Sequence, residues 1–442
     1  ADGEKCIYMA CSSNSCSGNL TWREADYTQK KEVLVCEKCG RKTQEGEFSL
    51  TRNSINKNKP DIVFTTTEML NQRMSDPDLR EVFGLGYKAY KKVELVLLDE
   101  VHTYGGSHGA QVAYLLRRWK YLHKKSVNFV GLSATLTDGK KFFSALTGVP
   151  EKYVEEIKPT ETEMEEEGME YMLALRGDPV SQTALLSTTI QTIMLIMRAL
   201  DNNSGMTPSI SEGIYGSKTF VFGDDLDVIN RLYFALLDAE ARDDSGAQDN
   251  LNRPLGALAA LRNPTGNNSH DRAGQSWQIA SNIGHDLIID RKRIGKTSSQ
   301  DTGVVDNTDA IVATASLEVG YNDATVGAVI QHKAPMGSAQ FIQRKGRAGR
   351  SRLMRPWMIT VLSGYGRDRL AYQGFERLFD PELPLPIMPI SSKYIQKMQA
   401  VFGLMDYLGT SYKRNIWKDL SRPNDPKKLV YIKNKLELIT TE

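Results

Sequence analysis

Cysteine is missing from most of the chain, because all five cysteines of the 442 residues fall within the first 39. A disulfide framework would spread its cysteines over the fold, so this distribution indicates a reducing compartment and predicts a cytoplasmic protein. No apolar run approaches the roughly 18 residues that would span a bilayer. The first residues also lack the basic start and apolar stretch of a signal peptide, so nothing predicts export or a membrane.

The chain also lacks a strong excess of charge of either sign. Its formal net charge is +2 and its pI is about 8.1, so the overall balance does not indicate a partner. A nucleic-acid binder would therefore have to show local basic clusters. Two are present. One is Arg344–Arg352, which reads RKGRAGRSR, and the other is the tail around Lys427, for which a solvated helix face is an equal alternative.

Apolar runs and amphipathic stretches alternate along the chain, which is typical of a doubly wound α/β fold. With 40% hydrophobic residues, the chain can bury a sizeable core. We expect buried strands at Asp61–Thr65, Val93–Leu98, Val127–Leu132, Lys218–Phe222, Ala310–Thr314, Val326–Gln331 and Trp357–Leu362, and helices at His108–Lys124 and Thr183–Leu200.

Composition shifts suggest the domain boundaries. Residues 151–180 are acidic and irregular, as in a connector, and 242–306 are rich in Asp, Asn, Gly and Ser, as in an insertion. We predict an α/β protein with a cysteine-bearing insertion at 1–45, a first doubly wound parallel-sheet lobe at 46–180, a second at 181–380 and a helical accessory element at 381–442.

The strongest local signal is the tetrapeptide Asp99-Glu100-Val101-His102, directly after an apolar strand. ATP hydrolysis needs one carboxylate at such a strand end to hold Mg²⁺ and a neighbouring one to activate water. Asp99 suits the first role and Glu100 the second, and His102 could sense the γ-phosphate. A polar strand end without catalysis is the alternative for these residues alone.

The order of two further motifs along the chain supports this interpretation. Ser133 and Thr135 come after the next strand, where short hydroxyl side chains can bond to the Asp-Glu-x-His loop. Then comes Gln343-Arg344-Lys345-Gly346-Arg347-Ala348-Gly349-Arg350, in which spaced arginines can stabilise a transferring phosphoryl group. This order, with this strand context, makes chance a poor explanation.

These motifs resemble those of superfamily 2 helicases, whose two lobes are RecA-like. The resemblance covers roughly residues 60–365 and implies ATP and Mg²⁺ in a cleft between the lobes, with nucleic acid lying across both. It assigns Thr314 and the motif-Ib residues Thr66 and Thr67 to the nucleic acid. It assigns Gly320, Asp323 and Arg344 to the nucleotide, and Gln343, Arg347 and Arg350 to catalysis.

A narrower resemblance is to the Hrq1/MrfA-like branch and to the helicase subunit of DISARM, a bacterial phage-defence system (DrmA-like). It rests on DEVHTYGGSHGAQVAYLLRRW and on the phrase from Ala315 to Arg350. It implies DNA as the substrate, although RNA stays open, and a protein partner subunit. A DNA-repair helicase and a restriction-type translocase remain alternatives.

One departure from the family matters, because the phosphate loop Gly-x-x-x-x-Gly-Lys-Ser/Thr is absent. In the family this loop precedes motif II, so we expect it before residue 1 of a longer protein. The alternative is a scaffold that has lost ATP chemistry.

The cysteines form two pairs with metal-ligand spacing. Cys36 and Cys39 make a Cys-x-x-Cys-Gly knuckle, and Cys11 and Cys16 are separated by four residues. A structural Zn²⁺ with four thiolates is the natural interpretation. Cys6 could replace Cys11, and buried or redox-active thiols are the alternative to a metal.

Overall fold

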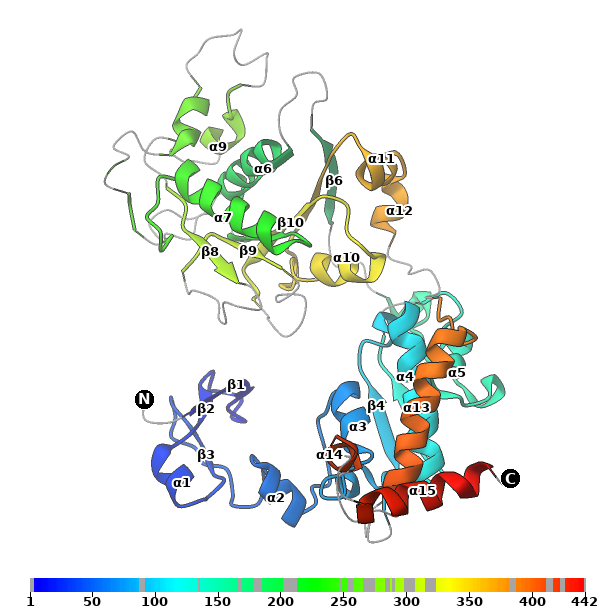
Figure 1. Ribbon diagram of the computed structural model, residues 1–442. Helices are drawn as coiled ribbons and strands as arrows, with labels where there is room; N and C mark the ends of the chain where they lie inside the picture. Colours follow the sequence, from blue (N-terminus) through cyan, green and yellow to red (C-terminus); the bar gives the residue numbers. More distant parts are fainter. Residues whose placement is uncertain are drawn as a thin grey trace. The chain divides into compact units, whose positions relative to one another are not determined.

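The computed structural model describes most of the chain, apart from its two ends and several internal stretches. The described residues are 4–86, 92–133, 136–164, 169–177, 185–201, 213–246, 248–250, 252, 257–264, 275–282, 287, 291–297, 307–314, 323–380, 387–410, 416–421 and 426–440. The chain forms two compact units (Figure 1): residues 1–157 with 384–442, and residues 158–383. Among the described helices, none is both long and apolar enough to cross a membrane.

The second unit is built on a six-stranded sheet in which every strand is parallel to its neighbours. The strand order is β6-β11-β10-β7-β9-β8, so the chain crosses over between strands, as a doubly wound fold requires. The strands are β6 (Tyr171–Arg176), β7 (Lys218–Phe222), β8 (Ile294–Thr297), β9 (Ala310–Ala313), β10 (Val326–His332) and β11 (Trp357–Leu362). The predicted parallel-sheet α/β class is confirmed for this unit.

Helices cover both faces of this sheet. Side chains of α6 and α7 pack with Val221 and Ile330 on one face, and Phe341 of α10 packs with Phe220 and Val329 on the other. Because successive strand residues point to opposite faces, all five residues of β7 are buried. The described helices are α6 (Leu185–Ala199), α7 (Leu226–Ala239), α9 (Gln278–Asn282), α10 (Ser338–Lys345), α11 (Gly366–Gln373) and α12 (Phe375–Phe379), with short 3-10 turns at Glu161–Glu163 and Leu258–Arg262.

A fully buried ion pair links α6 to the residue after α7, and its carboxylate also binds the stretch predicted as an insertion. Arg198 on α6 donates to both carboxylate oxygens of Glu240, at 2.7 and 2.6 Å. Glu240 also accepts the backbone N–H of Lys292 at 3.1 Å, and Arg242 donates to the carbonyl of Lys292 at 3.0 Å. The stretch predicted as an insertion therefore returns to the sheet, where it supplies the edge strand β8.

The first unit holds a smaller parallel pair, β4 (Leu95–Leu98) with β5 (Asn128–Gly131). Trp119 of α4 packs with Val96 and Phe129 and covers one face of this pair. Between residues 46 and 157, the described helices are α2 (Arg52–Lys57), α3 (Thr67–Arg73), α4 (Gly106–His123) and α5 (Gly139–Thr147). Short 3-10 turns lie at Arg80–Phe83, Val101–Thr103 and Glu151–Tyr153.

The opposite face of this pair is open. Leu95, Leu97, Val130 and Leu132 share it, and Leu97 is 64% exposed. The expectation that these strands are buried on both sides is therefore wrong for one face. The expected strand at Asp61–Thr65 is also wrong, since this segment is irregular and Phe64 is 97% exposed. A strand forms only beside a hydrogen-bonding neighbour, and within the described residues this sheet contains only β4 and β5.

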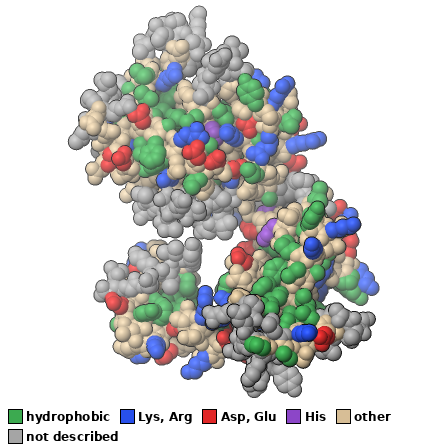
Figure 2. Space-filling view, viewed as in Figure 1, with side chains coloured by type: hydrophobic (Ala, Val, Ile, Leu, Met, Phe, Trp, Pro, Cys, Tyr) green, Lys and Arg blue, Asp and Glu red, His purple; other side chains and the backbone are tan. Residues whose placement is uncertain are grey.

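The C-terminal helices pack on the first unit, although they follow the second in sequence. Arg118 on α4 pairs with Asp406, Arg80 donates to the carbonyl of Gly409 at 2.8 Å, and Trp417 donates to Ser75 at 2.8 Å. The helices are α13 (Lys393–Thr410), α14 (Ile416–Leu420) and α15 (Pro426–Thr440). Figure 2 shows hydrophobic side chains over this part of the first unit. Tyr394 on α13 is 89% exposed.

The two-unit division differs from the predicted boundaries. The division falls after residue 157, so β6 joins the second sheet, whereas the sequence placed residues 151–180 with the first lobe and its connector. The pairing of β6 with β11 over Tyr171–Arg176 decides its place. No local pattern in the sequence carries that long-range pairing.

Replacing Glu240 with glutamine should lower the free energy of unfolding of the second unit. Arg198 would then stay buried without a counter-charge, which costs ~3–5 kcal/mol. Chemical denaturation followed by circular dichroism measures the loss. The control is Asp227→Asn, which removes an exposed pair with Arg231 and should cost at most about 1 kcal/mol. Equal losses in the two variants would contradict the importance of the buried pair.

Candidate functional site

Asp99 and Glu100 directly follow the carboxyl end of β4. The Asp99 side chain is exposed, and its Oδ1 accepts the backbone N–H of Glu100 at 3.0 Å. Glu100 has a left-handed backbone, with φ of 49°, which is uncommon for a residue with a side chain. The short 3-10 turn Val101–Thr103 is anchored by the N–H of Val101, which donates to the carbonyl of Leu132 at 2.9 Å. The sharp turn places both carboxylates at the strand end, where ligands bind in open parallel sheets.

His102 links this turn to the loop after β5. Its Nδ1 lies 3.3 Å from Oγ of Ser133, and its Nε2 lies 3.4 Å from Oε2 of Glu100. Burial lowers the pKa of His102, although the nearby carboxylates of Glu100 and Asp99 act in the opposite direction. A neutral imidazole can accept a hydrogen bond from the Ser133 hydroxyl at Nδ1 while its Nε2–H faces Glu100. The contact expected between the two motifs is present for Ser133, whereas Thr135 lies outside the described residues.

Three predicted nucleotide-site residues lie near the amino ends of the strands in the second unit's sheet. Asp323 lies just before β10, and Arg347 and Arg350 lie in the turn after α10. The N–H of Gly349 donates to the carbonyl of Val326 at 3.1 Å, which holds this arginine turn against the start of β10. The second unit therefore presents one carboxylate and two guanidinium groups along the amino ends of its strands.

Asp323 already has partners at this edge. Lys218, the first residue of β7, donates to it at 2.6 Å, and Thr325 donates from both its hydroxyl and its backbone. Burial would raise the pKa of Asp323, but these hydrogen bonds outweigh it and lower the pKa. Lys218 was not singled out from the sequence. A lysine that opens an apolar strand, as in KTFVF, is the signal that could have found it.

Arg344 is buried and has an internal partner. It donates to Asp224 at 2.6 Å and to Gln331 at 2.7 Å, and it lies over the ring of Phe222. These contacts hold α10 on the sheet, which gives Arg344 a structural role in the described chain. Its predicted contact with the nucleotide stays a prediction, as does the role of the half-buried Gln343. Gly320 lies outside the described residues.

The predicted nucleic-acid residues lie at ends of secondary-structure elements. Thr66 caps α3, since its hydroxyl accepts the N–H of Met69 at 3.2 Å, and Thr67 is the first residue of that helix. Thr314 follows the carboxyl end of β9. Because the strands are parallel, Thr314 lies at the sheet edge opposite to Asp323.

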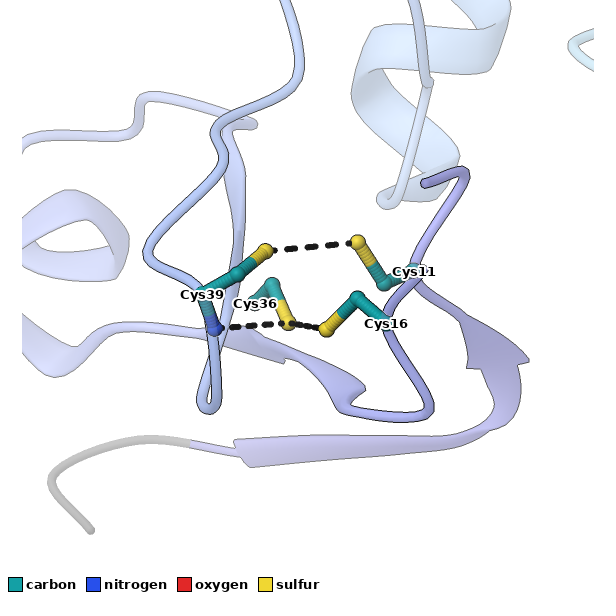
Figure 3. A group of neighbouring side chains, drawn as sticks. All are labelled: Cys11, Cys16, Cys36 and Cys39. Atoms are coloured by element: carbon teal, nitrogen blue, oxygen red, sulfur yellow. Dashed lines mark hydrogen bonds between the residues drawn. The ribbon is translucent and has the colours of Figure 1, made fainter. Parts of the chain in front are cut away.

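Four cysteine side chains converge near the N-terminus (Figure 3). The sulfur atoms of Cys11, Cys16, Cys36 and Cys39 all lie within 4.8 Å of one another. Cys11 and Cys39 sulfurs are 3.6 Å apart, and Cys16 and Cys36 sulfurs are 3.7 Å apart. Cys36 ends β3, and the other three lie in the loops of an antiparallel sheet of β1 (Glu4–Ala10), β2 (Asn19–Trp22) and β3 (Leu34–Cys36), with α1 (Glu24–Thr28) between β2 and β3 in sequence.

This cluster fits a tetrahedral zinc ion. Zn–S bonds of about 2.3 Å give sulfur–sulfur edges of ~3.8 Å, close to the two shortest pairs. The N–H of Cys39 donates to the sulfur of Cys36 at 3.5 Å, and this bond lowers the pKa of Cys36 to about 6, favouring the thiolate that a metal needs. A Cβ on Gly18 would lie 2.6 Å from that sulfur, so only glycine fits there. Four thiolates leave no open coordination position, so such a metal would be structural.

Two family models match the chain. Residues 23–142 match the DEAD/DEAH box helicase model, and residues 296–352 match the helicase conserved C-terminal domain. The chain is related to the superfamily 2 helicases. The first match contains the Asp99–His102 turn, and the second contains the arginine turn after α10. The predicted RecA-like α/β class is confirmed.

The curated relatives are longer proteins, and two of the three described here are named as helicases. The Lhr helicase/uracil glycosylase of Escherichia coli is 28% identical over 315 residues, which cover 67% of this chain and 18% of that protein. The ATP-dependent helicase hrq1 of Schizosaccharomyces pombe is 33% identical over 112 residues, 24% of this chain and 10% of that protein. The Druantia protein DruE of Escherichia coli is 33% identical over 110 residues, 23% of this chain and 6% of that protein.

Among solved structures, the DUF1998 helicase MrfA bound to DNA and AMPPNP has a TM-score of 0.51 at 13% identity. The match covers 86% of this helicase-related chain and 46% of the MrfA chain. At this identity the likeness shows the fold. The chain thus spans less than a fifth of Lhr and about half of MrfA.

Replacing Cys36 with serine should remove the metal from the protein. We expect about one zinc ion per chain in the unchanged protein and little in the variant, as measured by elemental analysis after dialysis. The variant should also become more sensitive to proteolysis within residues 1–45, because the metal joins the loops of a small sheet.

Cys6→Ser is the matched control, and it decides between Cys6 and Cys11 as the fourth ligand. The side chain of Cys6 lies outside what the structure describes, and the clustered thiol is that of Cys11, so Cys6→Ser should retain its zinc. Full zinc content in Cys36→Ser would show that the cysteines form no such site.

Proposed function

We propose that this chain is part of the motor of an ATP-dependent DNA helicase or translocase. The observation that carries the proposal is the contact chain from Glu100 through His102 to Ser133, which joins a hydrolytic carboxylate to the next strand's loop. The relatives named as helicases support the class of activity, and the structure of MrfA bound to DNA supports the substrate. RNA remains a substrate that the binding measurements below should include.

The proposed chemistry is phosphoryl transfer to water. Asp99 would hold Mg²⁺, which neutralises charge on the phosphate oxygens when it is bound. Glu100 would take the proton of the attacking water, and Arg347 and Arg350 would stabilise the charge on the transferring group. Because burial lowers the pKa of His102, this residue stays neutral near neutral pH and can pass a change at Glu100 to Ser133 by hydrogen bonding.

We further propose that additional polypeptide completes the first lobe and supplies the phosphate-binding loop. Parallel sheets are normally covered on both faces, yet Leu95, Leu97, Val130 and Leu132 leave one face of β4–β5 open. A covering α/β layer would bury this face and bring phosphate-binding backbone beside Asp99. The 442 residues alone should therefore bind ATP weakly, and activity should be measured on the longer protein.

A defence role is a finer proposal. The similarity to DruE, a Druantia protein, and the resemblance of residues 315–350 to the DISARM helicase subunit are the grounds for proposing it. A defence motor would act beside a partner subunit. Phage plaque counts on a host with and without the gene test this role, and sensitivity to DNA damage in the same pair of strains tests the repair alternative.

Glu100→Gln in the longer protein should abolish turnover and leave binding intact. Loss of a general base lowers rates by about 10²–10⁴-fold, while the neutral amide still fits the site. ATP hydrolysis with and without single-stranded and duplex nucleic acid, beside nucleotide and DNA binding, measures both properties. Glu94→Gln, an exposed carboxylate just before β4, is the matched control and should turn over normally.

Normal turnover in Glu100→Gln would disprove the catalytic assignment. Absent turnover in the unchanged longer protein, despite DNA binding, would instead favour a scaffold. ATP hydrolysis without strand separation would identify a translocase.

A further inference from the structure

Two exposed apolar side chains occupy neighbouring loops at the carboxyl edge of the second unit's sheet. Met336 follows β10 and is 71% exposed, and Tyr365 follows β11 and is 80% exposed. The strands are direct neighbours, and their loops lead into α10 and α11 (Figure 1). Single exposed apolar side chains are ordinary, but two of them on adjacent loops can offer one surface to a ligand.

The two loops are held together by a buried carboxylate. Asp368 accepts the N–H of Ala334 at 3.0 Å on one oxygen and the N–H of Ser363 at 2.9 Å on the other. Arg367 donates to the carbonyl of Ala334 at 2.8 Å. These bonds join the loops after β10 and β11 at their bases. Met336 and Tyr365 lie two residues after Ala334 and Ser363, so these hydrogen bonds fix the bases of the loops that carry them.

The loop after β10 shows a further sign of a fixed shape. Lys333 has a left-handed backbone, with φ of 67°, and its N–H donates to the carbonyl of Val361 at 2.9 Å. A residue with a side chain adopts this conformation only when its surroundings require it. The turn directs the chain toward Met336.

The charge around this pair is positive. Lys333, Arg367 and Arg369 are exposed on the same loops and on the first turn of α11. The acidic residues after the next strand, β7, already have partners: Asp224 pairs with Arg344, Asp227 pairs with Arg231, and Asp225 caps α7. The apolar pair is therefore flanked by three exposed cations, while the nearby Asp368 is buried and bonded to two backbone N–H groups.

We propose that Tyr365 and Met336 form a stacking platform for the bases of a single-stranded nucleic acid. An aromatic ring beside cationic side chains is the combination that such strands bind, and methionine can insert between base steps. Thr314 lies at the same sheet edge, three strand spacings or ~14 Å from β11. A strand could thus pass from Thr314 to Tyr365 along one edge. The inference rests on the proposed nucleic-acid motor and adds its base contacts.

A protein partner fits this surface less well. Stable protein interfaces bury about 1,200–2,000 Å² and need a broad apolar centre, whereas two side chains among exposed cations offer a narrow one. A strand of nucleotides needs only a ring to stack on and positive charge beside its phosphates.

Tyr365→Ala should weaken binding of an oligothymidylate of about 20 nucleotides by on the order of 5- to 100-fold, the loss expected from one stacked base. Fluorescence anisotropy of the full chain at stated salt measures it. Tyr365→Phe should bind nearly as the unchanged protein does. An abasic oligonucleotide should show little difference between Tyr365→Ala and the unchanged chain, because it offers no base to stack.

Salt dependence separates stacking from charge. Tyr365→Ala should leave the slope of log affinity against log salt unchanged, while Lys333→Ala or Arg369→Ala should reduce it by about one. Tyr121→Ala, an equally exposed tyrosine on α4, is the matched control and should bind normally. Thermal melting of Tyr365→Ala should match the unchanged chain, since the ring packs against little.

Unchanged affinity of Tyr365→Ala, or an equal loss on the abasic oligonucleotide, would overturn the platform while leaving the proposed motor intact. Unchanged affinity with loss of a co-purified protein would assign the surface to a protein instead. Failure of the unchanged chain to bind any single-stranded DNA or RNA would overturn both proposals.

Discussion

The common direction of the six strands in the second unit decides at which end of the sheet Asp323, Thr314 and the arginine turn lie. Because all strands run the same way, loops far apart in sequence can meet only at the two edges of the sheet. Asp323 and the arginine turn meet at the amino ends, while Thr314, Met336 and Tyr365 meet at the carboxyl ends. The proposed nucleotide and nucleic-acid contacts thus lie on opposite edges of one rigid layer. The buried Arg198–Glu240 and Arg344–Asp224 pairs stabilise helices on its two faces.

The first unit shows what happens when such a layer is short of strands. Its turn from Asp99 to His102 is well formed, because the N–H of Val101 bonds to the carbonyl of Leu132 and His102 lies against Ser133. Its apolar residues are not satisfied, since Leu95 and Leu97 face solvent. The geometry of the Asp99–His102 turn therefore does not depend on whether both faces of the β4–β5 pair are covered. The motif turn is formed within the described residues, whereas we propose that nucleotide affinity depends on a covering layer over the open face.

Sequence reasoning predicted the features that depend on local pattern. β7 and β11 occur at the residues expected, and α4 buries Val112, Leu115, Leu116 and Trp119 on the predicted face, because apolar periodicity encodes them directly. The four clustered cysteines were predicted from spacing. What depends on distant partners was not predictable: the place of β6, the exposure of Asp61–Thr65, and the pairs of Arg344 and Asp323. Each of these is decided by residues more than a hundred positions away or by absent neighbours.

The return of α13 to the first unit makes that unit discontinuous in sequence, with the second inserted between residues 157 and 384. During synthesis, the contacts of Arg118, Arg80 and Ser75 with the C-terminal helices must wait until the second unit, which lies between them in sequence, has been made. The second unit, whose sheet comes from one continuous stretch, can fold earlier. Truncation within the C-terminal helices would therefore destabilise the first unit, although these helices follow the second unit in sequence.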